Sequence, residues 1–118
     1  GHGKCGGCKA ALTQAFADAD HGAGGFVSDW VSLLDGAREK VIAKYGEGAE
    51  AGREMELESV RTSIANLRTF PFVTEAEAAG TLALRGAYFG IDKGQMLLLN
   101  EDDEFIQAEA AEAKSAKA

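Results

Sequence analysis

Hydrophobic residues recur at helical spacing through most of the first eighty positions of the chain. The clearest stripe repeats every three or four positions and consists of Leu57, Val60, Ile64 and Leu67. A stripe of this period is typical of an amphipathic helix that buries one face. Weaker stripes precede it, and Pro71 and Gly80 are placed to begin and end one further short helix. The sequence therefore predicts five helices, over residues 8–20, 26–34, 35–45, 54–68 and 72–79.

The hydrophobic pattern changes after Gly80, where apolar and small residues fall on alternate positions. This alternation predicts a strand over residues 81–89, with one face made of Leu82, Leu84, Gly86 and Tyr88. A second strand is predicted over residues 95–99, and the turn sequence Asp92-Lys93-Gly94 joins the two into a β-hairpin. Because a two-stranded hairpin is only marginally stable by itself, we expect it to join a larger sheet.

Two segments carry too little apolar surface to predict a packed element. Residues 46–52 are polar and rich in glycine, and they predict a loop. From residue 101 onward the chain is mostly Ala, Glu, Asp and Lys, and only Phe105 and Ile106 offer large apolar side chains to bury. We therefore expect one α/β domain over residues 1–106, followed by an Ala/Glu/Lys-rich tail over residues 107–118 whose end frays.

Charge and composition argue against several classes of protein. The chain has 118 residues and a net charge of −7, from 12 basic and 19 acidic residues, which argues against nucleic acid or an anionic membrane as a partner. No apolar run approaches the roughly 20 residues that span a bilayer. Two cysteines are too few for a secreted disulfide framework, so a reducing cytoplasm is the expected compartment.

The candidate chemistry lies in the first residues, where His2 and Cys5 stand three positions apart among glycines. Imidazole nitrogen and thiolate sulfur are two of the ligands that zinc prefers. Gly3, Gly6 and Gly7 permit the sharp backbone turn that brings both side chains to one ion. Two ligands do not complete a zinc site, so a third protein ligand has to come from elsewhere.

Cys8 extends this spacing to His-x-x-Cys-x-x-Cys and has three possible roles. It is interpreted as a residue one turn into the first helix that packs against the sheet, although a role as a third zinc ligand stays open. The pair Cys5 and Cys8 also has the Cys-x-x-Cys spacing of a redox pair, which would predict a disulfide in place of a metal. The sequence around the pair lacks a thioredoxin-like context, so the redox interpretation ranks last.

Residues 2–7, His-Gly-Lys-Cys-Gly-Gly, resemble the second zinc motif of the β-class carbonic anhydrases. The downstream blocks agree with that family in order and spacing. Residues 63–67 followed by 70–73 are similar to its long helix and proline break, and residues 80–89 resemble its fourth strand, with Gly94 in the hairpin to the fifth. The segment Asp29-Trp30-Val31 matches its acidic-Trp-aliphatic segment. The resemblance covers about residues 1–100.

The resemblance implies an α/β fold with a mostly parallel β-sheet, flanked by helices and ending in a C-terminal β-hairpin. It implies zinc-dependent, reversible hydration of carbon dioxide to bicarbonate and a proton, through a zinc-bound hydroxide. His2 and Cys5 are then metal ligands, and the backbone N–H of Gly6 is a hydrogen-bond donor in the substrate pocket. The aromatic residues Trp30 and Phe70-Phe72 are interpreted as core or subunit-interface anchors.

The family's first motif, Cys-x-Asp-x-Arg, does not occur in this sequence. In the family it supplies the third protein ligand of zinc and the catalytic Asp–Arg pair, so no catalytic residue is assigned here. We therefore expect this chain to correspond to the C-terminal part of such an enzyme and to be inactive by itself. The expected partners are the N-terminal half of the enzyme and a second subunit, in a homodimer or higher oligomer. The alternative function is that of a catalytically inactive zinc-binding or structural fragment.

Overall fold

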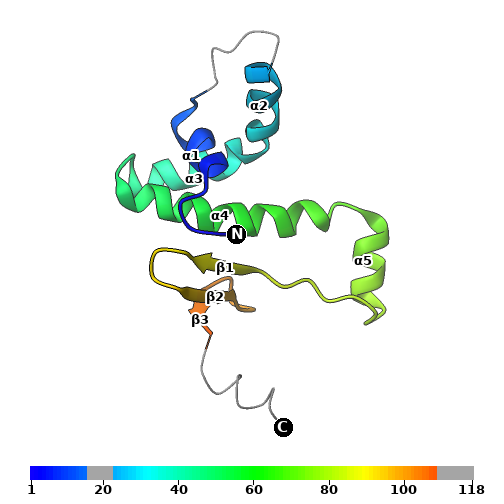
Figure 1. Ribbon diagram of the computed structural model, residues 1–118. Coiled ribbons are helices and arrows are strands. Elements are labelled where there is room, and N and C mark those ends of the chain that lie inside the picture. Colours follow the sequence, from blue (N-terminus) through cyan, green and yellow to red (C-terminus); the bar gives the residue numbers. More distant parts are fainter. Residues whose placement is uncertain (16–22, 109–118) are drawn as a thin grey trace.

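A computed structural model of the chain describes residues 1–15 and 23–108 (Figure 1). Its helices are α1 (Gly6–Thr13), α2 (Ala23–Val31), the 3-10 turn η1 (Ser32–Leu34), α3 (Asp35–Tyr45), α4 (Ala49–Leu67) and α5 (Pro71–Ala78). Its strands are β1 (Ala87–Gly90), β2 (Gln95–Leu99) and β3 (Phe105–Gln107). Helix α4 crosses the molecule between the other N-terminal helices and the sheet (Figure 1), and it contacts α1, α3 and β1.

The core lies where α1, α3 and α4 meet. Its buried members are Cys8, Ala11, Leu12, Ala37, Val41, Ala51 and Met55. Small side chains predominate in this set, so the three helices approach one another closely around the one long side chain, that of Met55. Within the part of the chain that the structure describes, no helix combines the length and the apolarity needed to cross a membrane.

The long helix predicted over residues 54–68 is confirmed, but it begins one turn earlier than predicted, at Ala49. Gly48, in an extended conformation, precedes its first turn. The prediction of a loop over the whole of residues 46–52 was therefore wrong. Alanine and glutamate are strong helix formers, and Ala51 is fully buried one turn before Met55. The packing of Ala51 in the core extends the helix toward its N-terminus. The sequence did not predict this, because the residues around Ala51 are polar.

The other helices differ from their predictions mainly at their ends. Helix α1 ends at Thr13 because Gln14 adopts a left-handed conformation with φ 54°. The predicted continuation to residue 20 lies partly outside the described residues, as does the predicted tail beyond residue 108. The segment predicted over residues 26–34 is α2 continued by η1. Helix α5 begins at Pro71, where a missing backbone N–H costs no hydrogen bond.

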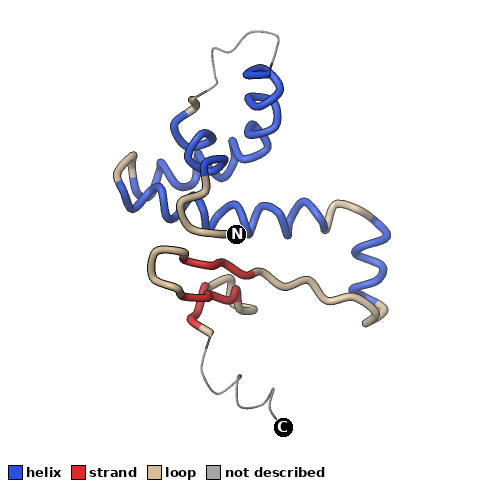
Figure 2. Tube along the Cα trace, in the orientation of Figure 1, coloured by secondary structure: helices blue, strands red, loops and turns tan. Residues whose placement is uncertain are grey.

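The predicted hairpin is confirmed as β1 paired antiparallel with β2, and β3 adds a third strand in the order β1-β2-β3 (Figure 2). The strand predicted over residues 81–89, however, pairs only from Ala87 onward. The N–H of Leu99 donates to the carbonyl of Gly86 at 2.9 Å, and β2 ends there. Residues 82–85 therefore extend past the end of the neighbouring strand.

The first three residues run beside β1 in the parallel direction. His2 forms a parallel bridge with Phe89, the N–H of Phe89 donates to the carbonyl of Gly1 at 2.9 Å, and the N–H of Gly3 donates to Phe89 at 2.7 Å. Helices packed against such a sheet agree with the predicted α/β class. A mostly parallel sheet is not confirmed, because this bridge is the one parallel pairing within residues 1–15 and 23–108, and the three strands are antiparallel.

Candidate metal centre

His2 and Cys5 lie at the turn that leads from the edge of the sheet into α1. His2 is exposed beside β1, and Cys5 is the half-buried residue immediately before the helix, packed against the core cluster. Between them Lys4 adopts φ 60°, a left-handed conformation that is uncommon for residues other than glycine. The turn therefore reverses the chain at Lys4, directly between the two candidate ligands.

The glycines of this motif have different roles from those predicted. We expected Gly3, Gly6 and Gly7 to supply the turn, yet the positive φ belongs to Lys4. Gly3 is required by close packing, since a Cβ there would lie 3.1 Å from the Tyr88 hydroxyl oxygen. A Cβ at Gly6 would meet nothing within 4 Å, so that position has free space above the helix N-terminus.

Gly6 is the first residue of α1, and its backbone N–H therefore has no acceptor one turn earlier in the helix. No acceptor for it is present among the described residues either. An unpaired N–H at a helix start favours a bound anion, because the helix dipole adds positive potential there. This geometry is compatible with the predicted role of Gly6 as a donor in a substrate pocket.

The donor set at this turn fits zinc by its chemistry but is incomplete. An imidazole and a thiol are suitable ligands, whereas a zinc site with an open position uses three protein ligands. Within residues 1–15 and 23–108, no group of three or more His, Cys, Asp or Glu side chains is arranged to hold a metal ion. The structure thus places His2 and Cys5 on one turn, and a zinc ion bound there would need a third protein ligand from outside the described residues.

Cys8 is buried one turn after Cys5, as predicted, but it packs in the cluster of α1, α3 and α4 and not against the sheet, where we expected it. The pKa of Cys8 is raised to about 11, mainly by burial and to a lesser extent by the neighbouring Cys5 side chain and the charge of Glu56, while the Ser59 side chain lowers it. The raised pKa disfavours the Cys8 thiolate, which is the form that zinc binds. Both cysteines are free thiols in the structure.

Tyr88 and Glu56 were not assigned to the site from the sequence. Tyr88 is 4% exposed, and its hydroxyl donates to Glu56 Oε1 at 2.7 Å. These residues lie 32 positions apart, on β1 and α4, so no local motif connects them. The only signal in the sequence is a glutamate beside the apolar stripe of the long helix, next to Leu57.

The hydrogen bond of Tyr88 predicts a loss of stability at alkaline pH. The pKa of Tyr88 is raised to about 12, mainly by burial and in addition by the hydrogen bond to Glu56 and its charge. Because the unfolded value is about 10, the tyrosine stabilises the fold below pH 10 and loses this contribution as pH rises from about 10 to 12. We expect the free energy of unfolding in urea to fall more steeply over this range for the unaltered protein than for Tyr88→Phe. Parallel curves would contradict the assignment.

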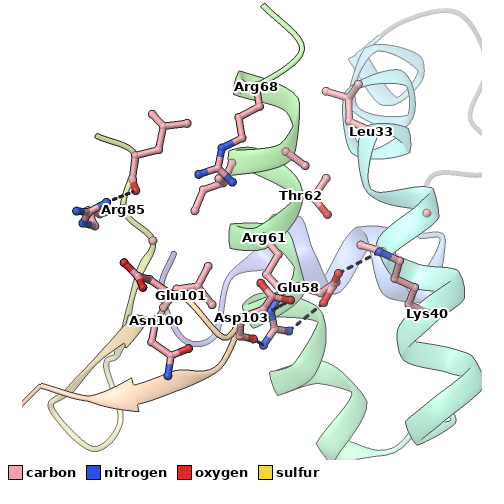
Figure 3. A pocket seen from close by; sticks show the side chains of 17 residues that line it. Leu33, Lys40, Glu58, Arg61, Thr62, Arg68, Arg85, Asn100, Glu101 and Asp103 are labelled. Atoms are coloured by element: carbon pink, nitrogen blue, oxygen red, sulfur yellow. Dashed lines mark hydrogen bonds and ion pairs between the residues drawn. The ribbon is translucent and has the colours of Figure 1, made fainter. Parts of the chain in front are cut away.

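A groove lies elsewhere, between α3, α4 and the loop after β2 (Figure 3). Four of its charged side chains form ion pairs: Arg61 bonds Glu58 at 3.0 Å and lies 3.4 Å from Asp103, and Lys40 lies 3.6 Å from Glu58. His2, Cys5 and Gly6 do not line it. The donor chemistry at the turn, and not this groove, therefore defines the candidate site.

Taken together, the helices, the sheet and the two donors at its edge define an α/β protein with a candidate metal site at a strand-to-helix turn. The family model described as carbonic anhydrase matches residues 1–96. The chain belongs to the carbonic anhydrase family, and the relatives below are of its β class.

Two known proteins illustrate the relationship. Beta carbonic anhydrase 3 of Arabidopsis thaliana is 30% identical over 96 residues, which cover 80% of this chain and 37% of that protein. The solved structure of the β-carbonic anhydrase CcaA superposes with a TM-score of 0.80 at 25% identity, over 92% of this chain and 52% of that one. The chain thus spans about half the length of the solved relative, and less of the plant protein. The predicted α/β class is confirmed by this likeness.

Proposed function

We propose that this chain supplies His2 and Cys5 as zinc ligands to an enzyme that interconverts carbon dioxide and bicarbonate. The observation that carries the proposal is the placement of both side chains on one turn, at the start of a helix whose first N–H is free. Membership of the carbonic anhydrase family supports the reaction class. When bound, zinc supplies a Lewis acid that makes water nucleophilic at neutral pH, for which carbonic anhydrase is itself the standard example.

The residues of this chain have three tasks in the proposed site. The turn at Lys4 connects His2, beside β1, to Cys5, immediately before the N-terminus of α1. The Gly6 N–H donates a hydrogen bond to an oxygen of the substrate or product, where developing negative charge is favoured. The remaining ligand and the Asp–Arg pair come from a Cys-x-Asp-x-Arg segment outside the described residues, in the same protein or a second chain.

We also propose a second subunit as a partner. Trp30 is 75% exposed, and Phe70 and Phe72 are 49% and 69% exposed with ring centroids 5.5 Å apart. Of the two interpretations of these side chains, core residues or subunit-interface anchors, their exposure favours the second. Large exposed aromatic groups are typical of surfaces that another polypeptide covers, which supports the proposed oligomer.

Stopped-flow measurement of carbon dioxide hydration tests the proposed function. The complete enzyme, which holds this chain together with the Cys-x-Asp-x-Arg segment, is assayed as purified, after removal of metal with a chelator, and after zinc is returned. We expect activity that disappears with the metal and recovers on addition of zinc. Zinc bound at one ion per site without hydration activity would support the alternative of an inactive zinc-binding protein. Activity that survives complete metal removal would contradict the proposal.

A further inference from the structure

The two glycines on either side of His2 both pack against Tyr88. A Cβ on Gly1 would lie 3.6 Å from Tyr88 Cδ2 and only 2.6 Å from Val60 Cγ2. A Cβ on Gly3 would lie 3.1 Å from the Tyr88 hydroxyl oxygen. The backbone on both sides of His2 is thus in close contact with one buried tyrosine.

Tyr88 is itself held from two directions. Its backbone belongs to β1, whose next residue Phe89 exchanges hydrogen bonds with Gly1 and Gly3 at 2.9 and 2.7 Å. Its hydroxyl donates to the Glu56 carboxylate of α4 at 2.7 Å. A hydrogen bond to an ionised acceptor is stronger than one between neutral groups, and here it fixes the far end of a ring that is 4% exposed.

We propose that Tyr88 and Glu56 are positioning residues for His2. Together they fix the position and direction of the His2 backbone, because the Tyr88 side chain packs against the glycines on both sides of it. The pair does not touch the reacting atoms in this assignment. It acts through Gly1, which packs against the ring, and Gly3, which packs against the hydroxyl. The part of the proposal that concerns metal binding rests on the proposed function, whereas the placement of the backbone does not.

A positioning role for Tyr88 differs from that of an ordinary core residue because it depends on the hydroxyl group. A tyrosine that only fills space would be replaced by phenylalanine with little effect, since the ring and its burial are kept. If Tyr88 only filled space, any polar residue could likewise replace Glu56. In the positioning role, loss of the hydroxyl frees the ring to shift and removes the oxygen that a Cβ on Gly3 would approach to 3.1 Å.

The first experiment compares zinc affinity in Tyr88→Phe and Glu56→Gln by competition with a chromophoric chelator, using the complete enzyme. Substitution of residues that orient a metal ligand costs about 10- to 100-fold in affinity, and we expect about a 10-fold loss for each variant. Tyr45→Phe is the matched control, because Tyr45 is the other tyrosine and lies on α3 with its ring beside Lys44. Unchanged affinity in Tyr88→Phe would overturn the proposal.

A second experiment uses the steric contact itself. Gly3→Ala introduces a methyl group against the Tyr88 hydroxyl and is expected to weaken zinc binding more than Tyr88→Phe does. In the double variant the hydroxyl is absent, so we expect a binding loss at least threefold smaller than the product of the two single losses. Residues in contact are non-additive in this way. Strictly multiplicative losses would show that Gly3 and Tyr88 act independently.

Amide hydrogen exchange separates this inference from the proposed function. In Tyr88→Phe the Gly3 N–H, which bonds Phe89, is expected to exchange at least about 10-fold faster, while the amides of β2 keep their rates. If the unaltered protein binds no zinc, the proposed function fails, and faster exchange at Gly3 still supports the positioning role. Unchanged exchange at Gly3 overturns that role whether or not zinc binds.

Discussion

Replacement of Cys5 by serine in the zinc-loaded enzyme is expected to remove the metal and to lower carbon dioxide hydration by more than about 100-fold. A serine hydroxyl is a far weaker zinc ligand than a thiolate, because it stays protonated at neutral pH. Loss of residues that only orient a ligand already costs up to about 100-fold, so loss of a ligand exceeds that range. Zinc content by atomic absorption and stopped-flow hydration measure the two effects separately.

Cys8→Ser is the matched control, since it makes the same chemical change three positions along the chain. The Cys8 thiol is buried and lies beside Ser59, so this variant is expected to lose some stability and to keep its zinc. Full zinc occupancy in Cys5→Ser would remove Cys5 from the ligand set. Loss of zinc in Cys8→Ser would instead make Cys8 the missing third ligand.

The local parts of this fold could be predicted from the sequence because local interactions determine them. The period of Leu57 and Val60 marks the buried face of α4, and Pro71 marks the start of α5. The ends of elements were predicted less well, since they depend on distant partners. Strand β1 begins at Ala87 because β2 ends at Leu99, and no property of residues 81–86 announces where its neighbour stops.

In the candidate site, too, local features could be predicted from the sequence and features that depend on distant residues could not. The residue types of His2 and Cys5, and their spacing, indicate zinc without any knowledge of the structure. The conformation of the turn was not predictable, because glycines surround Lys4 and the left-handed residue is nevertheless the lysine. The pair of Tyr88 and Glu56 was not predictable either, since its members meet only when β1 packs on α4.

This packing also explains why the ligand turn depends on the helical core. Cys5 contacts the core cluster from the N-terminus of α1, and the opposite side of that cluster is α4. The same helix carries Glu56, which accepts a hydrogen bond from Tyr88, the residue that packs against the glycines on both sides of His2. One helix therefore contributes to the surroundings of both candidate ligands: it belongs to the core cluster that Cys5 packs against, and it carries the acceptor of the Tyr88 hydrogen bond in the positioning role proposed for His2.

Met55 belongs to the core cluster that Cys5 packs against. Met55→Ala is expected to lower the free energy of unfolding by about 3 kcal/mol, within the roughly 2–5 kcal/mol typical of such truncations. Its side chain is 0% exposed, and the neighbours Ala37 and Ala51 are too small to fill the space it would leave. Urea unfolding measures the change. Met96→Ala, at a 41% exposed position of β2, is the matched control and is expected to cost less than about 1 kcal/mol. Equal losses in the two variants would mean that the α1–α3–α4 cluster is not the core that holds the ligand turn.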